Sequence, residues 1–159
     1  MRTSIPLWCR IEEQSSTLAR LYYRLMLVVG PSRSGKTTAL RRLSTERCWP
    51  LVNVSLALSE RLLELTSRQH AFAASRLLDQ VTKEPSGDVL LLDNTEILFN
   101  CALRLDPLRL LQGIARHRSV IASWAGHCDN GPLTYAVPGH PEFRQYENPD
   151  VVVVPTGST

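Results

Sequence analysis

The sequence predicts an α/β fold in which helices flank a mainly parallel sheet. Short continuous apolar runs, typical of strands buried on both faces, alternate along the chain with helical patterns. Turn residues separate most of these segments. A chain of 159 residues is long enough for one domain with a substantial core and too short for two ordinary ones. We therefore expect a single domain over residues 1–155.

The first half of the chain predicts two strands and the helices around them. The expected elements, in order, are an amphipathic helix at about 5–20, a strand at 25–29, a helix at 36–47, a strand within 49–55 and one or two helices within 58–84. Pro85 and Gly87 end the last helical pattern.

The second half predicts three more strands, which brings the expected sheet to five. The expected elements are a strand at 89–92 ending in Asp93, a helix at 106–116, a strand at 119–123, a loop rich in Gly, Asn and Pro, and a strand within 150–155. We expect residues 156–159 to form a disordered polar tail.

Residues 30–37 match the phosphate-binding pattern G-x-x-x-x-G-K-[ST], with a strand before them and a helix after them. Such a P-loop binds phosphates through backbone N–H groups and the positive end of the helix dipole. Lys36 is expected to contact the β and γ phosphates, and the Thr37 hydroxyl to bind Mg²⁺. The predicted nucleotide-binding residues are Gly30, Pro31, Ser32, Arg33, Ser34, Gly35, Lys36, Thr37 and Thr38.

Polar residues at the ends of two other predicted strands complete the expected site. Asp93 follows the apolar run 89–92 and is the candidate second ligand of Mg²⁺. Ser123 ends the next strand, where its hydroxyl could contact the γ-phosphate or the attacking water, or instead cap the backbone. The residue after Asp93 is Asn94, which cannot act as a general base.

The order of P-loop, acid-tipped third strand and polar-tipped fourth strand resembles the ASCE division of P-loop NTPases, which includes AAA+ and STAND proteins. This resemblance implies the sheet order 5-1-4-3-2. NACHT-like ATPases carry an acid at the position of Glu96, which makes Glu96 the candidate catalytic acid. AAA+ proteins carry an arginine finger between the fourth and fifth strands, where this chain has Arg144; Arg116 and Arg118 are alternatives.

More narrowly, the segments at 22–43, 90–99 and 139–146 resemble BrxF, a family of small P-loop proteins of type 3 BREX phage-defence systems. The resemblance implies a homo-oligomer that works with other BREX defence proteins, with DNA contacted directly or through the complex. Unlike AAA+ proteins, the chain is expected to have no helical lid domain. It also lacks the N-K-x-D guanine signature, which favours ATP over GTP.

We therefore expect an ATP-binding and ATP-hydrolysing switch or assembly subunit that uses Mg²⁺. The alternative is a nucleotide-dependent scaffold that oligomerises without significant hydrolysis, which Asn94 favours. A small-metabolite kinase ranks lowest. Such a kinase needs a lid with arginines over its acceptor site, and the 126–144 loop has one arginine. No membrane-spanning run or secretory signal is evident, so a cytoplasmic location is expected.

Overall fold

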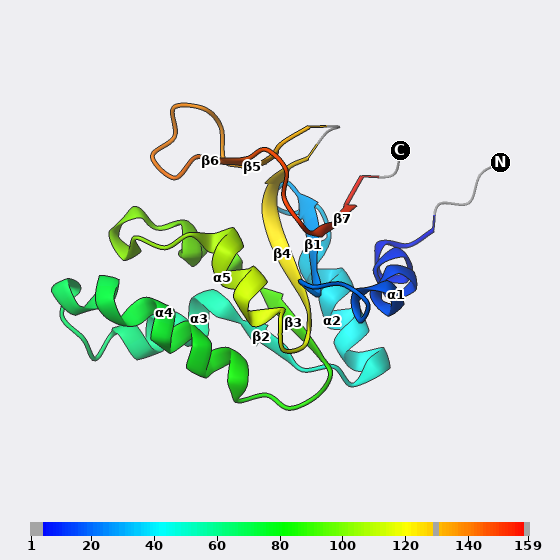
Figure 1. The fold of residues 1–159 in the computed structure, drawn as a ribbon, viewed down its shortest axis with the longest axis horizontal. Helices are drawn as coiled ribbons and strands as arrows, with labels where there is room; N and C mark the ends of the chain where they lie inside the picture. The colour runs from blue at the N-terminus through cyan, green and yellow to red at the C-terminus, as the bar shows by residue number, and fades with distance from the viewer. Residues whose placement is uncertain (1–4, 129–130, 158–159) are drawn as a thin grey trace.

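The structure is a computed structural model that describes residues 5–128 and 131–157. Helices cover both faces of a twisted sheet (Figure 1). The strands are β1 (Leu25–Gly30), β2 (Leu51–Asn53), β3 (Val89–Asp93), β4 (Ser119–His127), β5 (Leu133–Tyr135), β6 (Arg144–Tyr146) and β7 (Val152–Pro155). The helices are α1 (Leu7–Leu18), α2 (Lys36–Arg47), α3 (Val54–Leu62), α4 (Ser67–Lys83) and α5 (Pro107–Ile114), with two short 3₁₀ helices, η1 (Thr95–Phe99) and η2 (Cys101–Leu103).

The sheet order confirms the predicted arrangement of the five parallel strands. They lie in the order β2-β3-β4-β1-β7. Read from the other edge, with β7 counted as the fifth parallel strand, this is the predicted order 5-1-4-3-2. The prediction of five strands was wrong in number, because the described residues form seven. β4 is longer than predicted, and Gly126 and His127 at its end pair antiparallel with β5, which pairs with β6. This hairpin lies in the segment predicted to be a loop.

β1 lies inside the sheet, between β4 and β7, and has no polar side chain. Its alternate residues enter two separate apolar clusters, one on each face of the sheet. Leu25 and Leu27 pack on the face covered by α3, α4 and α5, whereas Met26 and Val28 pack on the face covered by α1 and α2 (Figure 1). Each fully buried aliphatic side chain of this kind contributes roughly 1.5–3 kcal/mol. This burial holds the end of β1, where the P-loop begins, in a fixed place.

Side-chain caps decide where two helices begin. The Asn53 side chain accepts a hydrogen bond from the Leu56 backbone N–H (3.0 Å), so α3 starts at Val54, inside the predicted second strand. Thr66 and Gln69 form a capping box at the start of α4. The predicted region of one or two helices therefore contains two, α3 and α4.

Residues 155–157, which end β7 and follow it, pack beside the P-loop. The Thr156 backbone N–H donates to the Val29 carbonyl (2.9 Å), and Arg10 of α1 donates to the carbonyls of Pro155 (2.9 Å) and Thr156 (3.2 Å). Of the tail expected at 156–159, the last two residues lie outside the described residues. No helix follows α5 in the described part of the chain. Nor is any helix there long and apolar enough to cross a bilayer.

Candidate nucleotide-binding site

The P-loop joins the carboxyl end of β1 to the amino end of α2. Gly30 is tightly enclosed, since a Cβ atom there would lie 2.1 Å from Thr156 Oγ1 and 2.7 Å from Ser34 Oγ. Gly35 has a φ of 98°, a backbone conformation that residues other than glycine rarely adopt. The pattern therefore requires glycine at both positions, for close packing at the first and for backbone geometry at the second.

The side chain of Lys36 is buried within the P-loop. Its side chain is 7% exposed, and Nζ donates hydrogen bonds to the carbonyls of Gly30 (2.8 Å) and Pro31 (2.6 Å). Burial lowers the pKa of the Lys36 ammonium, while the nearby carboxylates of Glu96 and Asp93 oppose that shift. The ammonium is thus held between the loop carbonyls and the acids of β3 and η1.

A hollow of about 460 Å³ joins the P-loop to the end of β3. Its lining comes from two segments more than fifty positions apart, and consists of Ser32, Arg33, Gly35, Lys36, Thr37, Thr38, Asp93, Asn94 and Glu96. Three other predicted P-loop residues do not line it. Gly30 and Pro31 line a neighbouring hollow, and the Ser34 hydroxyl donates to the Pro31 carbonyl (2.7 Å).

The two acids of the hollow occupy different kinds of backbone. Asp93 is 5% exposed and is the last residue of β3, whereas Glu96 is half-buried in η1. Asn94 between them has a φ of 51°, so the chain turns sharply there. The Asn94 carbonyl accepts from the backbone N–H (3.0 Å) and the hydroxyl (2.5 Å) of Ser55. Ser55 supports this turn, a role that the sequence did not indicate.

Ser123 lies in β4 beyond Ala122, which pairs with Leu92 of β3. Its side chain is 1% exposed, and its hydroxyl has no hydrogen-bond partner among the described residues. The Ser123 carbonyl accepts a hydrogen bond from the buried Thr95 hydroxyl (2.6 Å). Thr95 is a second supporting residue that sequence reasoning missed, because the contact joins segments 28 positions apart.

None of the three candidate arginine fingers lines the hollow. Arg144, the predicted finger, is the first residue of β6 and donates from Nη2 to the carbonyl of Leu105 (2.9 Å). Arg116 lies over the ring of Tyr22 (4.8 Å), and Arg118 donates to the carbonyls of Thr82 and Pro85. The structure therefore brings Lys36, Asp93 and Glu96 together, and places Ser123 and the three arginines outside the lining of the hollow.

The residues present fit a nucleotide with Mg²⁺. The loop offers backbone N–H groups and one buried ammonium, and the hollow adds three hydroxyls, Ser32, Thr37 and Thr38, and two carboxylates. Thr37 and Asp93 would hold Mg²⁺, which neutralises phosphate charge when bound. Among the described residues no group of three or more His, Cys, Asp or Glu could hold a metal ion. The donor set thus suits Mg²⁺ that shares its coordination with phosphate oxygens and water.

No protein-family model and no curated protein matches the chain. Among solved structures, the chain is similar to the structure of C. elegans PCH-2, with 19% identical residues and a TM-score of 0.44. The similarity covers 77% of this chain and 39% of the PCH-2 chain. This chain therefore corresponds to less than half of that protein's length.

Proposed function

We propose that the chain binds ATP with Mg²⁺ and hydrolyses it slowly, as a switch or assembly subunit. The observation that carries the proposal is the single hollow shared by the P-loop, Asp93 and Glu96. The P-loop residues from Gly30 to Thr38 bind the phosphates, and Thr37 and Asp93 hold Mg²⁺. Because phosphoryl transfer depends mainly on positioning and charge stabilisation, these groups supply most of what the reaction requires.

The Glu96 carboxylate orients the attacking water and accepts its proton. Its place in the hollow beside Asp93 supports this role, since a general base must lie within reach of the proton that it removes. We propose that the Ser123 hydroxyl, which is buried and has no protein partner among the described residues, contacts a phosphate oxygen or that water, although Ser123 does not line the hollow itself. Arg144 stays a candidate for a finger that reaches a neighbouring copy.

The resemblance to BrxF extends the proposal to a biological setting. We propose a component of a BREX antiphage complex that assembles with copies of itself and with other defence proteins. DNA is contacted by this chain or by the complex around it. Co-purification of the tagged chain with the other proteins of its defence locus, in the presence and absence of ATP, tests this part.

A scaffold that binds ATP without significant hydrolysis is the second candidate. The residue directly after Asp93 is Asn94, and Ser55 holds it in its turn by two hydrogen bonds to its carbonyl. An acid is therefore missing next to Asp93, and Glu96 would have to act from the following 3₁₀ helix. Steady-state phosphate release, measured with and without DNA, separates the two candidates.

The sharpest test of nucleotide binding compares the two lysines of the chain. Lys36→Ala should abolish tight ATP binding in calorimetric titration and leave the far-UV spectrum unchanged, because Lys36 Nζ donates to loop carbonyls and the residue belongs to neither apolar cluster. Lys83→Ala is the matched control, since its ammonium pairs with Asp79 on the exposed side of α4 (2.8 Å). Unchanged ATP affinity in the Lys36 variant would overturn the assignment of the P-loop.

A further inference from the structure

One side of α3 exposes leucines instead of polar residues. Leu56 is 57% exposed and Leu63, which follows the helix, is 82% exposed. Glu60 lies between them on the same side, because residues four and seven positions apart share a helix face. The opposite side of the helix is buried by Val54, Leu58 and Leu62. Leu56, Glu60 and Leu63, the α3 stripe, therefore have no apolar cover within the domain.

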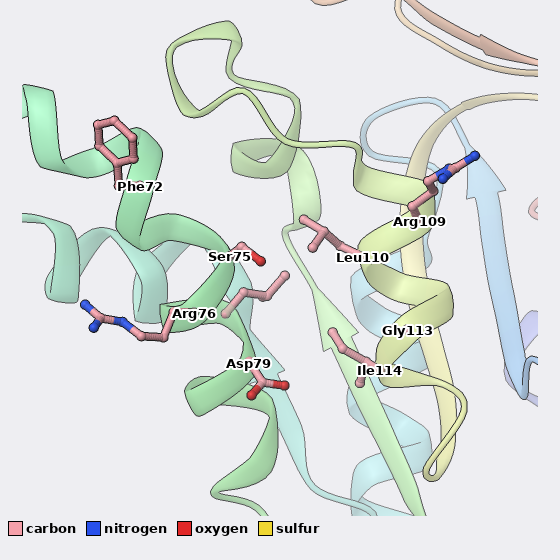
Figure 2. Close-up of a pocket in the computed structure, with 9 residues that line it drawn as sticks. Phe72, Ser75, Arg76, Asp79, Arg109, Leu110, Gly113 and Ile114 are labelled. Carbon is pink, nitrogen blue, oxygen red and sulfur yellow. The ribbon is translucent and has the colours of Figure 1, made fainter.

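A groove of about 630 Å³ lies between α4 and α5 (Figure 2). Leu110 and Ile114 point from α5 toward α4, and Ser75 faces them (Figure 2). Gly113 adds no side chain, and nothing lies within 4 Å of where its Cβ would be. Asp79 also lines the groove, where its charge is balanced by Lys83. The groove thus has an apolar floor wide enough for a side chain from outside.

A second, smaller hollow of about 300 Å³ lies next to this groove. Phe72 lines both hollows and is 86% exposed, so its ring forms a ridge between them. Arg76 also lines both. In Figure 2 Phe72 and Arg76 project outward from α4 and do not point at α5. The surface therefore offers two hollows of mixed apolar and polar lining, with an exposed aromatic ring and the Arg76 guanidinium at their border and Arg109 in the larger one.

The α3 stripe complements these two hollows in number and in charge, with two leucines for two hollows. Leu56 and Leu63 are seven residues apart, about 10 Å along a helix, with an acid between them. The two hollows have a cation between them. Neither Glu60 nor Arg76 has an ion pair or a side-chain hydrogen bond with any residue that the structure describes. The α3 stripe thus offers two leucines and an unpaired anion. The two hollows offer recesses for side chains and an unpaired cation.

We propose that the α3 stripe of one copy packs into the two hollows of a second copy, with its two leucines in the hollows and Glu60 against Arg76. The inference does not depend on the nucleotide site. Leucine burial provides most of the affinity, because an exposed ion pair contributes little to binding. The Glu60–Arg76 pair instead fixes the register and excludes wrong pairings.

The oligomeric mass in solution, measured by sedimentation over a range of concentrations, tests the proposal. The parent chain should self-associate, and Leu63→Asp should weaken association at least tenfold. Val137→Asp is the matched control, because Val137 is 62% exposed outside both surfaces and should leave association unchanged. Lys36→Ala should associate like the parent chain, so loss of nucleotide binding and loss of this contact are separate outcomes.

Charge reversal gives a test that a folding defect cannot imitate. Glu60→Arg places two cations together in a self-associating pair, and Arg76→Glu places two anions together. Each variant alone should associate more weakly than the parent chain. An equimolar mixture should recover association, because every contact between the two variants joins opposite charges.

Three results would overturn the inference. The first is a parent chain that stays monomeric at all concentrations. The second is association that neither Leu63→Asp nor the charge reversals change. The third is a monomeric chain that binds a labelled single-stranded oligonucleotide and loses that binding in Arg76→Glu, since the hollows would then serve a nucleic acid.

Discussion

Thr95 donates a hydrogen bond from its buried hydroxyl to the carbonyl of Ser123, 2.6 Å away. This contact ties η1, which carries Glu96, to the strand that carries the candidate phosphate sensor. Because both groups are shielded from water, neither has solvent as an alternative partner. The Thr95 hydroxyl therefore helps to hold η1 against β4, together with the edge-to-face contact of Phe99 with Trp124 (4.9 Å between ring centroids).

Thr95→Val should lower both stability and turnover. Valine keeps the shape of threonine but leaves the Ser123 carbonyl without its donor, at a cost of about 1–3 kcal/mol. Urea unfolding measures the first effect and steady-state phosphate release the second. Thr45→Val is the control, because the Thr45 hydroxyl donates to Arg41 on the exposed surface of α2 (3.1 Å). Equal effects of the two substitutions would show that the buried contact does not position η1.

Glu96→Gln should keep ATP affinity and lower turnover by roughly 10²-fold or more. The amide preserves size and hydrogen bonding but cannot accept a proton from water as the carboxylate does. Calorimetric titration and phosphate release measure the two properties on the same sample. Glu13→Gln, an exposed position on α1, should change neither. If Glu96→Gln turned over at the parent rate, Glu96 would not be the catalytic acid.

Ser123→Ala distinguishes a sensor from a structural residue. Removing a buried hydroxyl that has no protein partner among the described residues should leave the free energy of unfolding unchanged or slightly raised. Turnover should nevertheless fall about tenfold or more if the hydroxyl contacts phosphate or water. Ser119→Ala, at the first residue of the same strand, is the control for both measurements. A loss of stability without a loss of turnover would contradict the sensor role.

Tyr135 makes the folded state less stable as pH rises through the alkaline range. Burial, with smaller contributions from Glu142 and Glu96, raises the pKa of Tyr135 from 10.0 to about 12. Between these values the unfolded chain loses the phenolic proton while the folded chain keeps it, so stability falls as pH rises, by at most about 1.4 kcal/mol per pH unit. The free energy of unfolding of Tyr135→Phe, measured in urea, should fall less steeply than that of the parent chain over this pH window. Parallel pH profiles of the two proteins would refute the assignment.

Some elements could be predicted because local sequence alone specifies them. α2 spans the predicted residues Lys36–Arg47, since the motif fixes its start. The apolar runs of β1 and β3 identify buried strands whatever their neighbours are. The gathering of Asp93 and Lys36 in one hollow follows from the rule that ligands bind at the carboxyl ends of parallel strands.

Other features depend on contacts that one segment cannot reveal. The β5 and β6 strands have three residues each, too few for a pattern, and they form beside the end of β4. The Trp124 indole N–H donates to the Thr134 carbonyl (3.0 Å), a contact across the β4–β5 pair that holds the hairpin in place. The supporting hydroxyls of Ser55 and Thr95 were missed for the same reason: their partners are distant in sequence.

The place of β1 between β4 and β7 has a consequence for how the chain folds during synthesis. Leu25 pairs with Val120, 95 positions later, and Met26 pairs with Val152, 126 positions later. At a translation rate of roughly 5–20 residues per second, the most apolar strand waits several seconds for both neighbours. Pairing over such separations is also intrinsically slow. Expression yield should therefore respond to chaperone supply and to translation speed, even in variants whose folded state is unchanged.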